Sequence, residues 1–401
     1  MAVLTSISDK HIIYNLKFLS HLCFEVTEAC NLNCTYCAFS DLYTKGSIRD
    51  GEKMSFETAK TLLDYLWNLW EQDDVKKIPS RLNISFYGGE PLMNFPLIKE
   101  IVEYSERNVH RINRHLTYSM TTNAVLLPKH IDYLANKQFN LLISLDGDEW
   151  GDSYRVNHHK QPSFSIVIEN VIQVKKNYPD YFNEHISFNA VLNNRNSYEA
   201  ILRFFKETFD KRPTISPLSI ANLNPKEFER FLTILNQDQT DYSCLPLDQS
   251  PVLRSFIKEF EMKSGNAFYD FNELLYDKND GATLPTGTCV PFMKKMFLSA
   301  RGKILQCERI NHIFSLGDVT QDGVSLDYKK VANLYNQHTS KYSNQCSTCA
   351  LSHYCTKCVY LEVDNPCHSY KASSSSDIDT MRVQHNLPRA MELVYSSKTS
   401  R

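Results

Sequence analysis

The sequence has no apolar run of 18 residues or more, which is roughly the length that a membrane-spanning helix needs. Residues 1–17 lack the basic-then-apolar order of a secretory signal. Lysine and arginine total 44 against 46 acidic residues, so the net charge of −2 offers no excess of either sign that would attract nucleic acid or an anionic membrane. We therefore expect a cytoplasmic protein that binds neither nucleic acid nor a membrane.

Twelve cysteines are present in 401 residues, and in a secreted protein they would suggest six disulfides. The missing secretory signal argues against that interpretation. Ten of the cysteines lie in two groups, at residues 30–37 and 289–367, with spacings that suit a metal better than a bridge. Cys23 and Cys244 stand alone, and we expect them to be ordinary buried thiols.

Short β-type segments alternate with helical-period segments over roughly the first half of the chain, which is typical of a parallel α/β sheet. The clearest helix is expected at residues 55–71, with Ser55 as its N-cap. Six βα units are too few for a closed eight-stranded barrel, so the sequence predicts a partial (β/α)6 barrel of the TIM type. The strands are expected at residues 21–27, 82–87, 116–122, 141–146, 186–192 and 213–218.

Four domains or segments are expected along the chain. The partial barrel occupies residues 1–223, and residues 224–284 form a helical bridge or insert, which either links domains or binds a peptide. Residues 285–370 are cysteine-rich, with short β-type segments at 296–298 and 303–305, and predict a small metal-stapled domain. Residues 371–401 form a tail that is polar at first.

The first cysteine group follows the first expected strand directly. Cys30, Cys34 and Cys37 supply three thiolates within eight residues. A structural zinc ion or an electron-transfer cluster usually takes four protein ligands, so three thiolates leave one metal position open for a substrate or cofactor. Alone, the triplet is also compatible with part of a zinc site.

With Tyr36 before its last cysteine, the triplet resembles the CxxxCxΦC motif of the radical S-adenosylmethionine superfamily, in which Φ is aromatic. The resemblance implies that Cys30, Cys34 and Cys37 bind three irons of a [4Fe–4S] cluster and that S-adenosylmethionine (AdoMet) chelates the fourth. One electron from the cluster would then cleave AdoMet to a 5′-deoxyadenosyl radical, which abstracts hydrogen from the substrate.

Gly88, Gly89 and Glu90 follow the second expected strand and resemble the GGE motif that binds the amino group of AdoMet. Glycines allow close approach of backbone to ligand, and a carboxylate suits an ammonium group. Alone, the three residues are more typical of a simple turn.

Further pocket positions are implied where the next strands end. Arg155 with Ser144 resembles the pair that holds the carboxylate and ribose edge of AdoMet, although Arg155 would also suit a surface ion pair. Leu192 either packs on the adenine or belongs to the core. The implied positions at the ends of the third and fourth strands are Thr122, Asn123, Ser144 and Asp146.

The second cysteine group contains four closely spaced cysteines at residues 346–358. By themselves they fit a four-cysteine zinc site as well as an iron–sulfur site. The whole array resembles the SPASM domain of peptide-modifying radical enzymes, so the resemblance extends from about residue 20 to 370. It implies two auxiliary [4Fe–4S] clusters and three clusters in all. The inner cluster would take Cys289, Cys307 and Cys358, and the outer Cys346, Cys349, Cys355 and Cys367.

Two departures from the SPASM pattern leave alternatives open. Cys355 and Cys358 are separated by two residues rather than three, which affects their assignment. The inner cluster has three evident cysteines, so its fourth iron is either open or bound by another ligand such as Cys244.

Glu308 stands where sulfatase-maturing members have an aspartate that takes a proton, and it is either a general base or a solvated acid.

The motifs look most like those of bacterial maturases that act on ribosomally made precursor peptides. We therefore expect hydrogen abstraction from such a peptide, with a thioether or carbon–carbon crosslink as the product, and a flavodoxin- or ferredoxin-type reductant. Since 29 residues precede Cys30, fewer than the roughly 50 of a domain, the leader would be recognised by a separate protein or by the helical insert. The alternatives are an anaerobic sulfatase-maturing enzyme and, in another class, a zinc-stapled scaffold without enzymatic activity.

Overall fold

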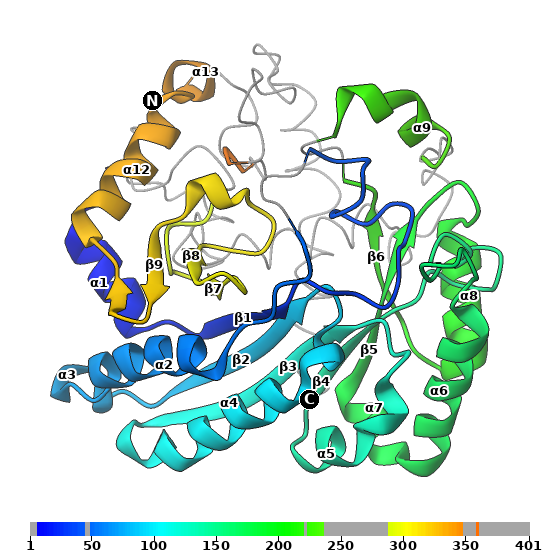
Figure 1. Cartoon of the computed structure of the whole chain (residues 1–401), viewed down its shortest axis with the longest axis horizontal. Coiled ribbons are helices and arrows are strands. Elements are labelled where there is room, and N and C mark those ends of the chain that lie inside the picture. The colour runs from blue at the N-terminus through cyan, green and yellow to red at the C-terminus, as the bar shows by residue number, and fades with distance from the viewer. Residues whose placement is uncertain (1–5, 45–48, 220–222, 236–287, 348–357, 361–401) are drawn as a thin grey trace, which may run out of the picture. The chain divides into compact units, whose positions relative to one another are not determined.

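A computed structural model describes residues 6–44, 49–219, 223–235, 288–347 and 358–360 (Figure 1). The chain divides into two compact units, and each is described by itself. The larger comprises Tyr14–Gln237 and Lys295–Asp327, and the other comprises Met1–Ile13, Asp238–Lys294 and Tyr328–Arg401. The expected domain boundaries stay a prediction.

A parallel sheet forms the core of the larger unit and confirms the expected α/β class. Its six barrel strands lie side by side in chain order, each parallel to the next. All six expected strands are present, within a few residues of the predicted ends. They are β1 (His21–Thr27), β2 (Ser80–Gly88), β3 (Arg114–Thr122), β4 (Asn140–Ser144), β5 (Ile186–Leu192) and β6 (Thr214–Pro217).

Helices connect these strands and lie along the outer side of the curved sheet (Figure 1). The side chain of Ser55 accepts a hydrogen bond of 3.1 Å from Thr58 N and so caps α2 as expected. The α-helices from α1 to α9 are α1 (Asp9–Lys17), α2 (Phe56–Trp70), α3 (Asp73–Lys76), α4 (Phe95–Asn108), α5 (Ile131–Asn136), α6 (Phe164–Asn177), α7 (Pro179–His185), α8 (Tyr198–Phe209) and α9 (Phe228–Leu232). The 3₁₀ helices are η1 (Pro91–Asn94), η2 (Val109–Arg111), η3 (Leu127–Lys129), η4 (Pro225–Glu227) and η5 (His312–Phe314).

The two faces of the sheet differ in polarity because side chains alternate along each strand. One face of β1 carries Leu22, Phe24 and Val26, which are all fully buried. The opposite face carries small polar side chains that bond across strands: Asn83 Nδ2 donates to Ser119 Oγ at 2.8 Å, for example. One face of this sheet is therefore apolar, and the opposite face is polar.

A second group of strands extends the same sheet beyond β1. β7 (Met296–Leu298) pairs in parallel with β1, and β8 (Lys303–Leu305), β9 (Gly317–Thr320) and β10 (Gly323–Ser325) follow in antiparallel order. The sequence predicted β7 and β8 but not their place beside β1, because strands of three residues carry no signal for their partner. Pairing with β7 covers the edge that β1 would otherwise expose.

The smaller unit contains α12 (Tyr328–Ser340) and α13 (Ser343–Ser347). The hydroxyl of Tyr335 donates to Thr288 O at 3.3 Å, and the N–H of Val359 donates to Thr288 Oγ1 at 2.9 Å. Among the residues that the structure describes, no helix is both long and apolar enough to span a bilayer. Most of the expected helical insert, residues 236–284, and the tail at 371–401 lie outside the described residues.

Candidate iron–sulfur and AdoMet site

The loop after β1 brings three thiols together. A turn closes with Cys37 N donating to Cys34 O at 3.1 Å, and Leu32 N donates to Cys30 Sγ at 3.4 Å. Burial raises the pKa of the Cys30 thiol to about 11 and that of Cys34 to about 12, and it also raises the pKa of Cys37. The protein alone therefore keeps these thiols protonated, and a metal must displace the protons to bind them.

This thiol loop, residues 30–37, is held by the segment that follows β4. Asn33 N donates to Val156 O at 2.7 Å, and Thr35 N donates to Tyr154 O at 3.0 Å. The Nε2 atom of His158 donates to Cys30 O at 2.8 Å. The sequence did not identify His158, since its only signal is a position three residues after Arg155.

Tyr36, the aromatic residue of the motif, anchors the loop from inside. Its ring is buried, and its hydroxyl donates a hydrogen bond to the carboxylate of Asp146, two residues after β4. The guanidinium of Arg155 lies 5.6 Å from the centre of the same ring. The expected cofactor-binding residues Tyr36, Asp146 and Arg155 therefore form one contact group.

Arg155 forms a buried ion pair. Its Nη2 atom lies 2.9 Å from Oδ1 of Asp146, and its Nε atom lies 3.5 Å from Asp152. Burial and the charge of Asp146 raise the pKa of Asp152 to about 8. Since both Asp146 and Arg155 are buried, the pair is not the surface pair considered as an alternative, and a role for Arg155 toward AdoMet stays a prediction.

The two glycines of the GGE sequence leave space for the backbone at the end of β1 and just after it. A Cβ atom on Gly88 would lie 2.1 Å from Thr27 O, and one on Gly89 would lie 2.2 Å from Ala29 O. Gly89 N donates to Thr27 O, and Glu90 N donates to Ala29 O, each at 2.9 Å. The end of β2 is therefore locked against the segment that enters the thiol loop, and this contact requires glycine.

Glu90 lies at the meeting point of the motifs. Its buried carboxylate accepts from Thr122 Oγ1 at 2.7 Å, from Asn123 N at 2.7 Å and from Leu92 N at 3.1 Å. Burial raises the pKa of Glu90 to about 7, although the bond from Asn123 acts in the opposite direction. The side-chain amide of Asn123 lies 3.8 Å from Cys30 Sγ, so the carboxylate and the thiol loop share a neighbour.

The last two expected pocket residues, Ser144 and Leu192, lie at the carboxyl ends of the neighbouring strands β4 and β5. Ser144 closes β4 and pairs in register with Asn189 of β5. Leu192 closes β5 and is 8% exposed, which suits a core residue and an adenine contact equally. Their roles toward AdoMet stay predictions.

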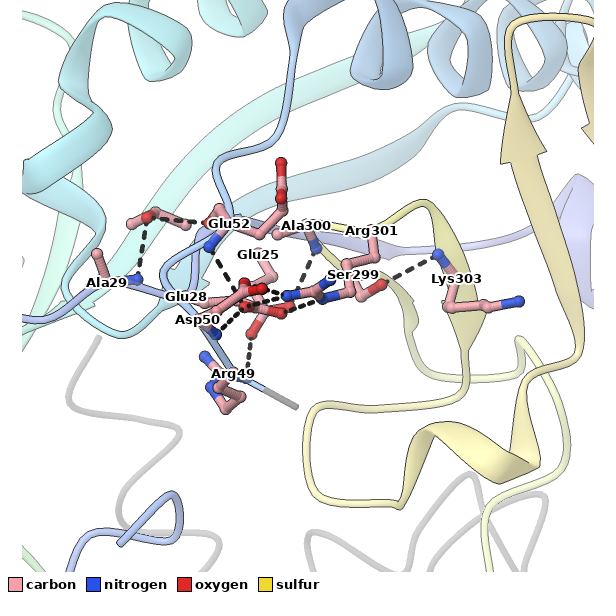
Figure 2. A network of polar contacts seen from close by, with 11 residues as sticks. Glu25, Glu28, Ala29, Arg49, Asp50, Glu52, Ser299, Ala300, Arg301 and Lys303 are labelled. Atoms are coloured by element: carbon pink, nitrogen blue, oxygen red, sulfur yellow. Dashed lines mark hydrogen bonds and ion pairs between the residues drawn. The ribbon is translucent and has the colours of Figure 1, made fainter. Parts of the chain in front are cut away.

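Two buried glutamates of the first strand region escaped the sequence analysis. Arg301 makes two bonds to Glu28, and Arg49 lies 2.7 Å from Glu25 (Figure 2). A signal was available: Glu25 falls between the apolar Phe24 and Val26 in the first strand, and a buried carboxylate requires a partner. The partners themselves come from distant parts of the chain.

Glu308 pairs with Lys295, whose Nζ atom lies 3.0 Å from its carboxylate. Burial alone would raise the pKa of Glu308, but the charge and hydrogen bond of Lys295, a backbone hydrogen bond and the charge of Arg309 together lower it. Glu308 is thus an ionised, paired carboxylate rather than the solvated acid of the alternative. Its role as a general base stays a prediction.

Part of the second cysteine group lies in the smaller unit. The bond between Val359 N and Thr288 joins the residues next to Cys358 and Cys289, for which the family resemblance implies a shared cluster. Within the described residues, no three His, Cys, Asp or Glu side chains are placed to hold a single metal ion. The cysteines outside the described residues are Cys244, Cys349, Cys355 and Cys367.

A thiol loop of this kind fits a cluster whose irons each take one thiolate. It supplies three sulfur ligands, which is the donor set that iron–sulfur clusters use, and Cys23, Cys30, Cys34 and Cys37 form no disulfide. The carboxylate of Glu90 and the amide of Asn123 lie beside it as polar groups for a ligand. The residues present therefore fit a cluster with an adjacent small-molecule site.

Several known proteins resemble part of this chain in sequence. Uncharacterized protein MJ0907 of Methanocaldococcus jannaschii is 32% identical over 257 residues, which are 63% of this chain and 79% of that protein. The cysteine-type anaerobic sulfatase-maturating enzyme of Clostridium novyi is 28% identical over 55% of this chain and 59% of its own. The radical SAM cyclopropyl synthase TigE of Paramaledivibacter caminithermalis is 27% identical over 51% of this chain and 42% of its own. The chain therefore spans about half the length of these two named enzymes.

Solved structures extend the similarity in fold over nearly the whole chain. Native anSMEcpe with bound AdoMet and Cp18Cys peptide gives a TM-score of 0.59 at 17% identity, covering 94% of this chain and 99% of that one. The same protein with bound AdoMet gives 0.61, also at 17% identity, over 93% of this chain and 98% of that one. Residues 24–233, more than half of the chain, match the model of the Radical SAM superfamily. The protein is therefore an enzyme, and it belongs to the Radical SAM superfamily.

Proposed function

We propose that this enzyme abstracts a hydrogen atom from a ribosomally made precursor peptide and so installs a thioether or carbon–carbon crosslink. Membership of the superfamily implies a [4Fe–4S] cluster and AdoMet. The observation that carries the peptide proposal is the second cysteine group, in which Thr288 and Val359 bring the chain beside Cys289 and Cys358 together. The relative named as a sulfatase-maturating enzyme and the peptide-bound neighbour in fold support the same class of substrate.

Different residues of the chain have different proposed roles at the radical site. When bound, the cluster and AdoMet supply an organic radical that abstracts hydrogen. Cys30, Cys34 and Cys37 hold the cluster, and Glu90 receives the ammonium of AdoMet while Thr122 and Asn123 fix the direction of its carboxylate. The remaining proposed pocket residues are Tyr36, Gly88, Gly89, Ser144, Asp146, Arg155 and Leu192.

Two auxiliary [4Fe–4S] clusters complete the proposal. Cys289 and Cys358 contribute to one of them, and the contact between Thr288 and Val359 is what supports their pairing. These clusters bind the substrate or accept the electron that remains after a bond has formed. In the larger unit, Glu308 is available as a base for the substrate once its ion pair with Lys295 is broken.

The second candidate is anaerobic sulfatase maturation, the oxidation of a cysteine or serine to formylglycine. Two of the relatives carry that name, and the neighbour in fold at a TM-score of 0.61 supports it. Glutamate at position 308, where that group has an aspartate, favours the crosslinking reaction instead. A separate leader-binding protein and a flavodoxin- or ferredoxin-type reductant are the proposed partners.

Mass spectrometry of a candidate precursor peptide tests the proposal. The peptide, one encoded near the enzyme's gene, is incubated anaerobically with enzyme, AdoMet and reductant. Loss of two hydrogens from a peptide that then resists fragmentation between two residues supports a crosslink. An aldehyde that a hydrazide reagent captures supports formylglycine. AdoMet cleavage with no change in any candidate peptide or in a sulfatase-derived peptide contradicts both.

A further inference from the structure

Four charged side chains surround the two ends of the thiol loop. Glu25 and Glu28 belong to β1 and the residues just after it, while Arg49 lies beyond the loop and Arg301 lies in the turn between β7 and β8. Figure 2 shows the two arginines approaching the two carboxylates from different parts of the chain. Both carboxylates are buried, so their charges depend on these partners.

Glu28 is held in one fixed orientation. Arg301 donates from Nε to Oε1 at 2.8 Å and from Nη2 to Oε2 at 3.0 Å, the two-bond geometry that only arginine provides. The N–H groups of Asp50 and Glu52 also point at Oε2, each at 3.3 Å. Glu28 lies two residues before Cys30, so this orientation sets the start of the thiol loop.

Glu25 links the same turn to the far end of the loop. Ala300 N donates to its Oε2 at 3.0 Å, and Arg49 Nη1 donates to its Oε1 at 2.7 Å. The guanidinium of Arg49 lies 3.5 Å from the centre of the Phe39 ring, two residues after Cys37. The turn between β7 and β8 therefore reaches both ends of the loop through two carboxylates.

We propose that Arg301 is a positioning residue for the radical cluster: acting through Glu28, it fixes the thiol loop so that Cys30, Cys34 and Cys37 present the cluster to AdoMet in one geometry. The turn between β7 and β8 thereby becomes part of the radical site. The proposal rests on the AdoMet chemistry of the superfamily and is independent of the peptide substrate.

A matched control exists in the same turn. Lys303 forms an ion pair of 2.5 Å with Asp318 of β9, and neither residue contacts the thiol loop through this pair. Lys303→Ala therefore removes a charge and an ion pair from the β7–β8 hairpin without touching Glu28. A purely structural role of the hairpin charges would give Lys303→Ala and Arg301→Ala the same effect.

The experiment compares reconstituted Arg301→Ala, Arg301→Lys, Glu28→Gln and Lys303→Ala without any peptide. Its readouts are bound iron, the EPR spectrum of the reduced cluster before and after AdoMet, and the rate of 5′-deoxyadenosine formation. Arg301→Ala should lower that rate about 10- to 100-fold and alter the AdoMet-induced EPR change. Arg301→Lys should recover part of both, and Lys303→Ala should stay within about twofold of the parent enzyme.

A double variant tests whether Arg301 acts through Glu28. Glu28→Gln combined with Arg301→Ala should lower the rate no further than Arg301→Ala alone, which removes the pairing with Glu28 and also an ion pair with Asp50. An unchanged rate and EPR spectrum in Arg301→Ala overturns the proposal, as does an equal loss in Lys303→Ala. If Arg301→Ala fails to fold, parent-like spectra and rates in both Arg301→Lys and Glu28→Gln overturn it. Because peptide is absent, failure of the proposed function leaves these outcomes unaffected.

Discussion

The hydroxyl of Thr122 donates a hydrogen bond of 2.7 Å to Oε1 of Glu90, which joins the end of β3 to the GGE sequence at the end of β2. The neighbouring N–H of Asn123 donates to Oε2 at the same distance. Both oxygens of the carboxylate thus have fixed donors, and its orientation is set before any ligand arrives. This preorganisation makes Glu90 the most informative residue of the proposed AdoMet pocket.

Replacing Glu90 should weaken AdoMet binding. Glu90→Gln removes the negative charge that would receive an ammonium group, and a hydrogen bond to a charged group contributes about 1.5–3 kcal/mol, so the Kd for AdoMet should rise roughly 10- to 100-fold. Thr122→Ser keeps the hydroxyl donor and should bind nearly as the parent does. Equilibrium AdoMet binding under anaerobic conditions measures both, and an unchanged Kd in Glu90→Gln would remove Glu90 from the pocket.

A methyl group at Gly89 should disturb the thiol loop. Its Cβ atom would lie 2.2 Å from Ala29 O, so Gly89→Ala must displace the segment that leads to Cys30, and the variant should bind less iron after reconstitution. Gly323→Ala is the control, because its Cβ atom would meet nothing within 4 Å although the backbone φ of +127° disfavours alanine there. Full iron loading of Gly89→Ala, at the level of Gly323→Ala, contradicts the prediction.

Breaking the buried pair of Arg155 should destabilise the fold. Arg155→Met leaves the buried Asp146 charge without its partner, and such a loss typically costs about 3–5 kcal/mol in the free energy of unfolding. Lys206→Ala removes an ion pair whose two side chains are both about three-quarters exposed, and it should leave stability unchanged. Denaturant unfolding of the two variants under identical anaerobic conditions compares them. Equal stability would mean that the Arg155 pair contributes little.

His21 should make the fold less stable in mild acid. Burial, with the nearby Lys295 ammonium, lowers the pKa of His21 to about 4, and its Nε2 atom lies 2.6 Å from Ser85 Oγ. Below the unfolded pKa of about 6.5, the unfolded chain binds a proton that the folded chain does not, so stability falls as the pH falls. Between about pH 7 and 5.5 the parent should lose up to about 1 kcal/mol more than His21→Asn. Parallel pH profiles of the two proteins contradict this.

Much of the barrel could be predicted from the sequence because its signals are local. β1 and β5 occur at the expected residues, since each is a short β-type segment bounded by a change of pattern. The place of β7 beside β1 could not be predicted, and neither could the bonds from Arg301 to Glu28. Partners 273 residues apart leave no local pattern, and the fold alone brings them together.

The same distinction holds for the candidate site. Cys30, Glu90 and Asn123 were named from short motifs, and the fold brings them to one place. The motif did not reveal that Gly88 and Gly89 accommodate protein backbone, because the neighbour comes from the preceding strand. His158 and Asp152 were missed because their contacts with the loop and with Asp146 arise only after folding.

The central claim is that Cys30, Cys34 and Cys37 hold a cluster that cleaves AdoMet. The most direct test compares the anaerobically reconstituted parent with Cys34→Ala for iron, sulfide and 5′-deoxyadenosine formed from AdoMet under reducing conditions. The account predicts iron and sulfide in equal amounts, about twelve of each per chain for three clusters. It also predicts that Cys34→Ala forms no 5′-deoxyadenosine while remaining folded. Bound zinc without sulfide, or full 5′-deoxyadenosine formation by Cys34→Ala, would contradict it.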